Sequence, residues 1–170
     1  MATFGKTDTE GSTYGGPAGG VFACRYYLSE DAIALPEIWA YIAKQGPGVA
    51  LARCSIYSDL NGVPDSRIAV TEEGEIPYTT LSWVRFPFAT PFGLTRGYYW
   101  LAINVNSAYY YVRDVGVANQ QYFKWSAYPT FPDPFGAADS KLASKYTIYA
   151  VYTPVTPPPP GTLQVHAYVG

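Results

Sequence analysis

The residue types that most often carry catalysis are sparse in this chain. His166 is the only histidine, and it lies on the polar side of an alternating segment near the C-terminus. As a general base it would need a serine or cysteine nucleophile and an orienting carboxylate brought to it from elsewhere. Paired carboxylates for glycoside hydrolysis would have to flank a groove, but the acids cluster in turns such as Glu72–Glu75. We therefore predict that the protein is not an enzyme.

One segment has the composition of a cation site. Asp59, Asn61 and Asp65 surround Gly62 in the sequence DLNGVPD, and such an alternation of oxygen-bearing side chains resembles a calcium-binding loop. The segment lacks the later acidic positions of an EF-hand, and the residues on both sides of it alternate as strands. Asn-Gly is also the commonest sequence of a tight hairpin turn. A turn is the preferred interpretation, a structural calcium ion is the alternative, and no other cofactor is expected.

The two cysteines, Cys24 and Cys54, each lie in an alternating segment. Cys24 shares a face with Phe22, and Cys54 shares a face with Ile56, so both thiols are expected to point into the core. A disulfide between them would form if the two strands face each other. Two buried free thiols that pack as small apolar residues are the alternative. Two cysteines with a single histidine do not make a metal site.

The strands that must position these residues are marked by period-two alternation. The segment 97–105 places Leu101 and Ile103 on one face and Tyr98 and Trp100 on the other. A second run, 109–113, follows Asn106-Ser107, and the two runs predict a β-hairpin. Similar patterns predict further strands at 21–28, 32–44, 49–58, 67–73, 81–88, 121–127 and 145–152. Nine or ten short strands and no convincing helix predict an all-β fold, a β-sandwich of two antiparallel sheets.

Aromatic residues on the outward faces of these strands are the main functional signal. A half-buried strand normally carries polar side chains on its solvent face. Rings on that face could stack on sugars, while nearby amides bind the sugar hydroxyl groups; Asn104, Asn119, Gln120 and Gln121 are the candidate amides. Rings could equally form a subunit interface, which is enriched in Tyr and Trp and depleted in charge. The candidate contact surface consists of Trp39, Tyr41, Tyr98, Trp100, Tyr109, Tyr111, Trp125 and Tyr128.

The composition narrows the class of protein. Hydrophobic residues make up 48% of the 170 residues, which excludes a disordered chain. Charged residues are only 14% and aromatic residues 17%, a balance typical of contact surfaces. The net charge is −2, without a basic stripe, so nucleic-acid binding is not expected. No apolar run is long enough to cross a bilayer as a helix, so membrane insertion is not expected either.

Changes in composition along the chain predict four regions. Residues 1–20 are rich in Gly, Ser and Thr and predict an extended N-terminal arm without the apolar stretch of a signal peptide. Residues 21–153 form the sandwich. Residues 154–161 include four consecutive prolines, which favour a stiff extended spacer. Residues 162–170 alternate as a strand that cannot bury its apolar face alone, and so either links to the sheet edge of a neighbouring subunit or begins a further domain.

Four motifs follow one another along the chain: IYSDLNGVP (56–64), FPFATPFGLTRGYYWLAIN (86–104), PTFPDPFG (129–136) and KYTIYAVY (145–152). Their order is similar to that of a known group of domains. The resemblance covers about residues 2–153 and is to jelly-roll, carbohydrate-binding-module-like domains of secreted bacterial and archaeal proteins and of phage or virus surface proteins. It implies a jelly-roll sandwich with varied partners and no shared catalytic residues, and it implies that a structural calcium ion is common.

Together these patterns predict a non-catalytic structural or adhesive module of a surface-exposed assembly, such as a virion, a fibre or an extracellular filament. Its partners would be copies of itself or other structural subunits, bound through aromatic faces and terminal segments. Its expected location is extracellular or on a virion surface. The alternative is a carbohydrate-binding module that the proline spacer attaches to a larger secreted protein, with a polysaccharide as its ligand.

Overall fold

The computed structural model describes residues 1–155, and its regular structure there is entirely β-strand. The prediction of an all-β fold with two antiparallel sheets is confirmed, with fourteen strands in place of nine or ten. No helix in this part of the chain is long and apolar enough to cross a membrane.

Sheet A contains β1 (Ala2–Gly5), β2 (Ser12–Gly16), β4 (Ala32–Lys44), β8 (Ser82–Leu94), β10 (Tyr109–Val115), β13 (Ser144–Tyr146) and β14 (Ile148–Pro154). Sheet B contains β3 (Gly20–Leu28), β5 (Leu51–Leu60), β6 (Val63–Val70), β7 (Gly74–Glu75), β9 (Gly97–Val105), β11 (Gln121–Trp125) and β12 (Ser140–Leu142).

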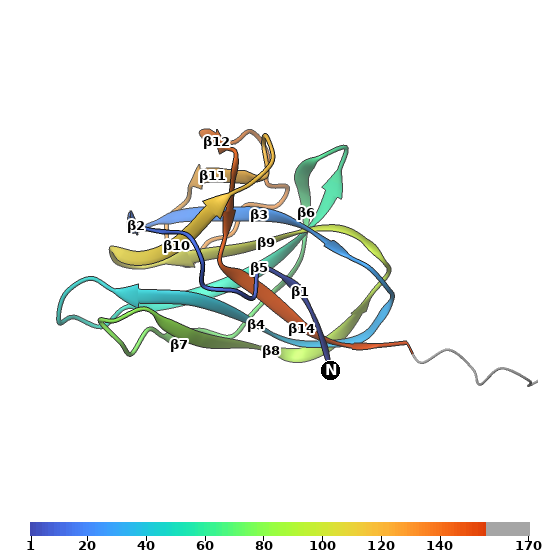
Figure 1. The fold of residues 1–170 in the computed structure, drawn as a ribbon, viewed down its shortest axis with the longest axis horizontal. Helices are drawn as coiled ribbons and strands as arrows, with labels where there is room; N and C mark the ends of the chain where they lie inside the picture. Colours follow the sequence, from blue (N-terminus) through green and yellow to red (C-terminus); the bar gives the residue numbers. More distant parts are fainter. Residues whose placement is uncertain (156–170) are drawn as a thin grey trace, which may run out of the picture.

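The two sheets lie face to face, and Figure 1 shows β3, β9 and β5 over β4, β14 and β8. In sheet A, β8 pairs with one edge of β4, and β14 and β10 pair in succession with the other edge. In sheet B the order is β12-β11-β3-β9-β5-β6, with β7 beside β5. From β3 to β9, the strands of nine or more residues alternate between the two sheets.

The core between the sheets is built from alternate residues of each strand. On β9, Leu101, Ile103 and Val105 point inward, as the sequence pattern predicts, and all three are buried. They meet inward residues of β4 such as Ile38 and Ile42. Full burial of one such aliphatic side chain contributes roughly 1.5–3 kcal/mol relative to leaving it in water. The inward face of each strand therefore fixes the strand's orientation in the sandwich.

The prediction that the runs 97–105 and 109–113 form a β-hairpin is wrong. β9 pairs with β3 and β5 in sheet B, whereas β10 pairs with β2, β4 and β13 in sheet A. The turn between them carries the chain from one sheet to the other. Its Asn106 exchanges hydrogen bonds with Leu51: the side-chain oxygen accepts from the Leu51 N–H at 2.8 Å, and the Asn106 N–H donates to the Leu51 carbonyl at 2.9 Å. Both edges of β9 have longer partners, which leaves none for β10.

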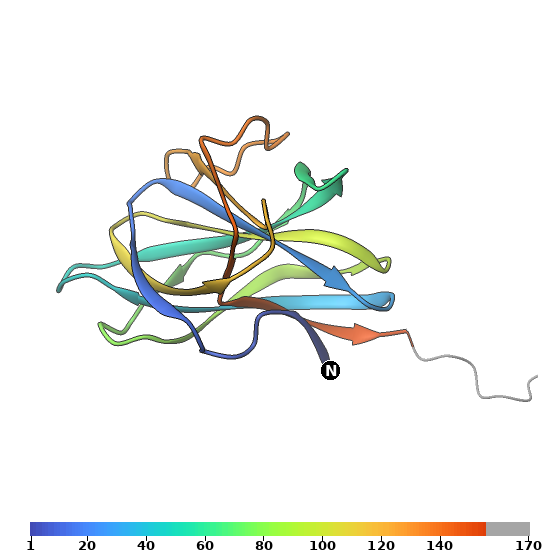
Figure 2. The same cartoon turned by 45° about the horizontal axis from the view of Figure 1, so that its top comes forward.

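The predicted boundary of the sandwich at residue 21 is also wrong. β1 pairs with β14 over Ala2–Gly5, and β2 pairs with β10 over Ser12–Gly16, so the N-terminal arm belongs to sheet A. Figure 2 shows the dark blue N-terminal strand beside the red-orange β14. Gly5 makes the close approach possible: its φ is +124°, and a Cβ there would lie 2.4 Å from the Ile148 carbonyl oxygen.

At the other end, β14 extends to Pro154. The predicted spacer therefore begins inside the last strand of the sandwich. Residues 156–161 of the predicted spacer, the predicted strand 162–170 and His166 lie outside the described residues.

The segment 126–139 covers part of the outer face of sheet B. Phe131 and Phe135 from this segment join Trp100, Tyr57 and Tyr122 of the sheet in a second buried cluster. The Tyr57 hydroxyl donates to the Pro132 carbonyl at 2.9 Å. The segment therefore forms a third layer over part of sheet B, with its own small core.

Candidate functional site

The eight residues predicted to form one contact surface are divided among several places in the fold. Trp100, Tyr109 and Tyr111 are buried, so the prediction that they are exposed contact residues is wrong. Trp100 does point to the outer face of sheet B, but the segment 126–139 covers it. Tyr109 and Tyr111 point into the core between the sheets, because β10 crosses to sheet A and only Tyr110 of the three consecutive tyrosines faces outward.

Three other predicted contact residues lie on the side of sheet B. Tyr98 is exposed on β9, and Trp125 is exposed at the end of β11, where its ring packs edge-on against Phe123. Tyr128 is half-buried in the covering segment, and its hydroxyl donates to Glu73 at 2.7 Å. Burial, and then the hydrogen bond to Glu73, raise the pKa of Tyr128. These residues do not form a continuous aromatic surface with Trp39 and Tyr41.

Trp39 and Tyr41 lie on the outer face of sheet A, where two further aromatic residues join them. Trp83 on β8 is the cross-strand partner of Tyr41, and Tyr149 on β14 is the partner of Trp39. The ring centroids are 5.2 Å apart for Tyr41–Trp83, 4.8 Å for Trp83–Tyr149 and 6.5 Å for Trp39–Tyr149. We call these four rings the sheet A cluster. Each ring remains partly exposed, so the cluster presents an aromatic surface across three adjacent strands.

One ion pair borders the sheet A cluster. The Glu37 carboxylate accepts a hydrogen bond from the Trp39 indole N–H at 2.8 Å and another from Arg85 Nε. The carboxylate is mostly buried, whereas about half of the Arg85 side chain is exposed. Burial, and then the negative charge of Glu37, raise the pKa of Tyr149, so this ring stays a neutral phenol at physiological pH. The cluster thus combines apolar ring surface with one fixed pair of opposite charges.

The alternation pattern of the sequence alone could have identified Trp83 and Tyr149 as outward-facing residues. In SWVRF, alternation around the core residues Val84 and Phe86 puts Trp83 and Arg85 on the outer face. In KYTIYAVY, the core residues Ile148 and Ala150 put Tyr149 outward in the same way. What alternation could not show was that β8 and β14 flank β4 at this register.

The segment that holds the candidate calcium ligands is a hairpin turn, the interpretation preferred from the sequence. Asn61 and Gly62 have φ values of 54° and 84° and connect β5 to β6 as a two-residue loop. The Asp59 carboxylate accepts from Arg25 Nε at 2.7 Å, Arg25 Nη2 at 2.9 Å, the Trp100 indole N–H at 2.8 Å and the Gly62 N–H at 3.0 Å. The Arg25 guanidinium therefore takes the position that a cation would need, and the donor set does not fit calcium.

The electrostatics of Asp59 follow from these contacts. Burial would raise the pKa of this carboxyl group, but the hydrogen bonds from Arg25, the Gly62 N–H and Trp100 outweigh it and lower the pKa. Arg25 is held from its other side by the Tyr98 ring, whose centroid lies 3.8 Å from the guanidinium carbon. The Asp59 carboxylate and the Tyr98 ring thus hold the Arg25 side chain in place on the outer surface of sheet B.

A disulfide between Cys24 and Cys54, one of the two possibilities that the sequence left open, is excluded by strand order. β9 lies between β3 and β5, with Cys24 opposite Leu101 and Cys54 opposite Ile103. Two strand spacings amount to roughly 9–10 Å, beyond the Cα–Cα separation of about 7 Å that a disulfide can bridge. Both cysteines are free and buried, as the alternative interpretation has it. Burial raises the pKa of Cys24 to about 12 and raises that of Cys54, so neither thiol is a nucleophile at neutral pH.

The amides predicted to bind sugar hydroxyl groups serve other roles. Asn104 is buried and donates to the carbonyls of Ser126 and Thr130 at 3.3 and 3.0 Å, which anchors the covering segment. Gln121 is buried and accepts a hydrogen bond from the Ser144 hydroxyl at 2.8 Å. Asn119 has a φ of 58° in the turn before β11. Of these four amides, Gln120 lines the pocket described next.

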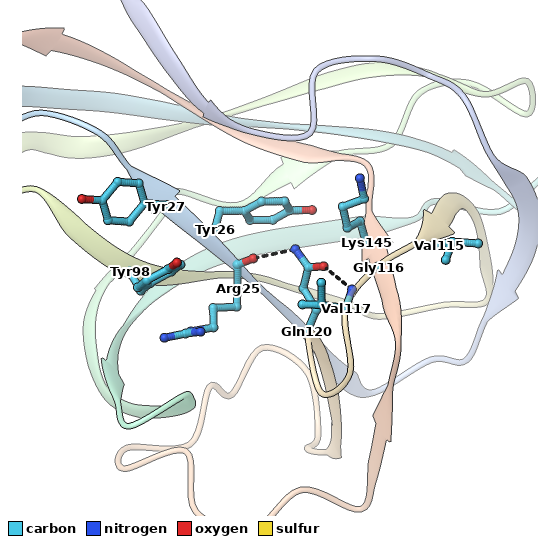
Figure 3. Close-up of a pocket in the computed structure, with 9 residues that line it drawn as sticks. All are labelled: Arg25, Tyr26, Tyr27, Tyr98, Val115, Gly116, Val117, Gln120 and Lys145. Atoms are coloured by element: carbon cyan, nitrogen blue, oxygen red, sulfur yellow. Dashed lines mark hydrogen bonds between the residues drawn. The ribbon is translucent and has the colours of Figure 1, made fainter.

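That pocket lies beside the second half of β3 and has a volume of about 560 Å³. We call it the β3-edge pocket. Figure 3 shows Tyr27 and Tyr98 toward one end and Lys145 and Val115 toward the other, with Gln120 between them. The Gln120 side chain donates to the Arg25 carbonyl at 3.1 Å and accepts from the Val117 N–H at 3.0 Å, so it holds the turn against the strand. The remaining lining residues are Arg25, Tyr26, Gly116 and Val117.

Within residues 1–155, no group of three or more His, Cys, Asp or Glu side chains is placed to hold a metal ion. Comparison of the sequence with known protein families finds no family model that matches it, and comparison with curated proteins finds no significant match. The surfaces described above are therefore the basis of the functional argument.

Proposed function

We propose that this protein is a non-catalytic, jelly-roll-type structural module that associates with copies of itself or with other structural subunits through the sheet A cluster. The assembly would be surface-exposed, such as a virion, a fibre or an extracellular filament. The observation that carries the proposal is the aromatic outer face of sheet A. Four partly exposed rings on three neighbouring strands, next to one ion pair, have the composition of the centre of a protein interface.

The contrast between the two outer faces supports this assignment. The aromatic residues on the outer face of sheet B, such as Trp100 and Tyr57, are covered by the chain's own segment 126–139. The rings of the sheet A cluster keep exposed surface. Clustered apolar side chains that remain exposed on a folded domain are typical of sites where another molecule binds. A second subunit on sheet A would bury these rings as the segment 126–139 buries those of sheet B.

A non-catalytic role is supported by what the reactive groups do. Asp59 is bonded to Arg25, and Glu37 is bonded to Arg85. None of the nine residues that line the β3-edge pocket is acidic, so it has no pair of carboxylates for glycoside hydrolysis. Both thiols are buried and protonated.

The test is the mass of the full chain in solution, measured by light scattering after size-exclusion chromatography over a range of concentrations. We expect defined oligomers. Arg85→Glu places a second negative charge beside Glu37 on an exposed part of the cluster, and it should weaken association about thirtyfold, the loss expected at an interface hot spot. Trp39→Ala combined with Trp83→Ala should have at least the same effect. Circular dichroism would show that each variant is folded.

Trp125→Ala is the matched control, because Trp125 is exposed but lies on sheet B outside the cluster. It should not change the mass. Comparison with a chain that ends at Pro154 would measure what the C-terminal residues add to association. A full chain that stays monomeric at every concentration, or oligomers that survive all of the cluster variants, would overturn the proposal.

The alternative, a carbohydrate-binding module, has one specific observation in its favour. A Trp ring flanked by a carboxylate and a guanidinium, as Trp39 is by Glu37 and Arg85, offers both a stacking face and polar groups for hydroxyls. Under this alternative the chain is monomeric, and Trp39→Ala abolishes its retention on an insoluble polysaccharide. Retention by a monomer would therefore replace the assembly proposal.

A further inference from the structure

Where β3 lines the β3-edge pocket, one edge of this strand has no partner strand. β11 pairs with β3 only as far as Gln121 opposite Cys24. One residue further along β3, the Arg25 N–H donates to the Gln120 carbonyl at 2.9 Å, and the Arg25 carbonyl accepts from the Gln120 side chain at 3.1 Å. Both backbone groups of Arg25 therefore point toward the β11 side.

The alternation of backbone groups along a strand then fixes the next position. The N–H and C=O of Tyr27 must point the same way as those of Arg25. No backbone or side-chain group of the described chain is hydrogen-bonded to them on that side, because β11 no longer runs beside the strand. Tyr27 thus presents a free donor and a free acceptor to the pocket.

Apolar side chains gather around this edge. Tyr27 and Tyr98 are 51% and 48% exposed, and their ring centroids are 4.9 Å apart. On the other side of the pocket, Val115 and Val117 are 80% and 70% exposed. These four side chains line one pocket, although they come from three separate parts of the sequence. An apolar rim around a free strand edge suits the side chains of an added strand.

The charged side chains of the pocket favour an anionic ligand. Its two charged side chains, Arg25 and Lys145, are both cations. Asp59 neutralises Arg25, but no ion pair to Lys145 occurs within the described chain. Asp114, its cross-strand neighbour, accepts instead from the Val115 N–H at 2.7 Å. The ammonium group of Lys145 is therefore available to an anionic ligand.

From these observations we infer that the β3-edge pocket binds an extended, acidic peptide segment of a partner protein. The segment adds as a short strand to the free edge of β3 at Tyr27. Its apolar side chains contact the tyrosine pair and the two valines, and a carboxylate pairs with Lys145. This site is separate from the sheet A cluster and does not depend on the self-association proposed there.

The first test concerns the free edge itself. In the full-length protein, the amide of Tyr27 should exchange with solvent much faster than that of Tyr26, which faces β9 within the sheet. Hydrogen-exchange NMR measures both amides in one experiment. Slow exchange at Tyr27 in the free protein would show that the edge is already occupied and would overturn the inference.

The second test identifies the ligand. A phage-displayed library of random linear heptapeptides is panned against the full-length protein, and enriched peptides are synthesised and titrated. We expect β-branched residues alternating around an acid, and bound peptide should protect the Tyr27 amide from exchange. Lys145→Gln should weaken the binding of acidic peptides several-fold. It should hardly change the binding of the same peptides with glutamine in place of the acidic residue. Tyr27→Ala should weaken both.

Matched controls are available elsewhere on the surface. Lys141→Gln makes the same change at a cation that does not line the pocket, and Tyr78→Ala removes a tyrosine as exposed as Tyr27. Neither should change peptide affinity. If no peptide is enriched, if the controls act like the pocket variants, or if only an oligosaccharide panel binds at the pocket, the inference is wrong.

Discussion

At the scale of single residues, Asp59 shows how one carboxylate can join several parts of a fold. It lies in β5, yet it accepts hydrogen bonds from Arg25 of β3, from Trp100 of β9 and from the Gly62 turn. Only about a tenth of its side chain is exposed. A partly buried carboxylate with this many donors stabilises the fold mainly because its partners would otherwise lose their hydrogen bonds.

Asp59→Asn should therefore lower the free energy of unfolding by about 2 kcal/mol, since an amide cannot accept from Arg25 as a carboxylate does. The folded-state pKa lies below the ordinary 3.8, so the advantage of the wild type is present above that value. It should disappear as the pH falls through the lower, folded-state pKa. Urea unfolding of both proteins over a series of pH values measures this.

Asp65→Asn is the control, because Asp65 lies in the same segment of candidate calcium ligands, but within the described residues its side chain is hydrogen-bonded only to Ser66. It should change stability by less than about 0.5 kcal/mol. The wild-type unfolding midpoint should not respond to calcium or to a chelator. A midpoint that rises with calcium would contradict the assignment of Asp59 to Arg25.

At the scale of elements, the segment 126–139 decides which outward-facing aromatic side chains of sheet B are buried. It has no strand of its own. It is held by Phe131 and Phe135, by the hydrogen bond from Tyr57 to Pro132 and by the bonds from Asn104. Irregular chain can serve as a packed layer when its backbone groups find such partners.

Phe135→Ala should lower the free energy of unfolding by about 3 kcal/mol, because Phe135 is fully buried and its ring packs at right angles to the Tyr57 ring. If the segment then lifts from the sheet, Trp100 becomes accessible, and acrylamide should quench the tryptophan fluorescence more strongly. Phe135→Leu keeps most of the apolar volume and should cost about 1 kcal/mol. Normal stability in the alanine variant would show that the segment is not a packed layer.

At the scale of the whole molecule, the core is unusually rich in tyrosine. Tyr26, Tyr109 and Tyr146 are buried between the sheets, close to Cys24: the Tyr26 hydroxyl donates to the Tyr146 carbonyl, and the Tyr146 N–H donates to Cys24 Sγ. Burial raises the pKa of all three phenols and of the Cys24 thiol. The aromatic content of the chain therefore fills the core as well as the surface.

Because of these buried groups, we expect the free energy of unfolding to fall steeply at alkaline pH. Each of these groups has a folded-state pKa above its unfolded value, so its contribution is complete below the ordinary values of 9.0 for Cys and 10.0 for Tyr. Above them the unfolded chain ionises while the folded core cannot, and the free energy of unfolding falls as the pH rises. Urea unfolding at increasing pH, followed by tyrosinate absorbance and near-ultraviolet circular dichroism, measures this. Tyrosinate absorbance from all tyrosines while the native signal persists would contradict it.

The sequence by itself determined the strand content and the face of each side chain relative to its own strand. Alternation correctly put Leu101 and Ile103 inward and Trp39 and Trp100 outward, because successive side chains of any strand point to opposite sides. The Asn61-Gly62 turn was equally local, since its backbone angles are set by the two residues themselves.

Only the tertiary structure decided what covers each face and which strands are neighbours. Trp39 and Trp100 have the same local pattern, yet one remains partly exposed and the other is buried under a segment some thirty residues further along the chain. The pairing of β10 with sheet A turned Tyr109 and Tyr111 inward, and the position of β9 kept Cys24 apart from Cys54. These outcomes depend on contacts between residues far apart in the sequence, and the periodicity of one strand carries no information about its partners.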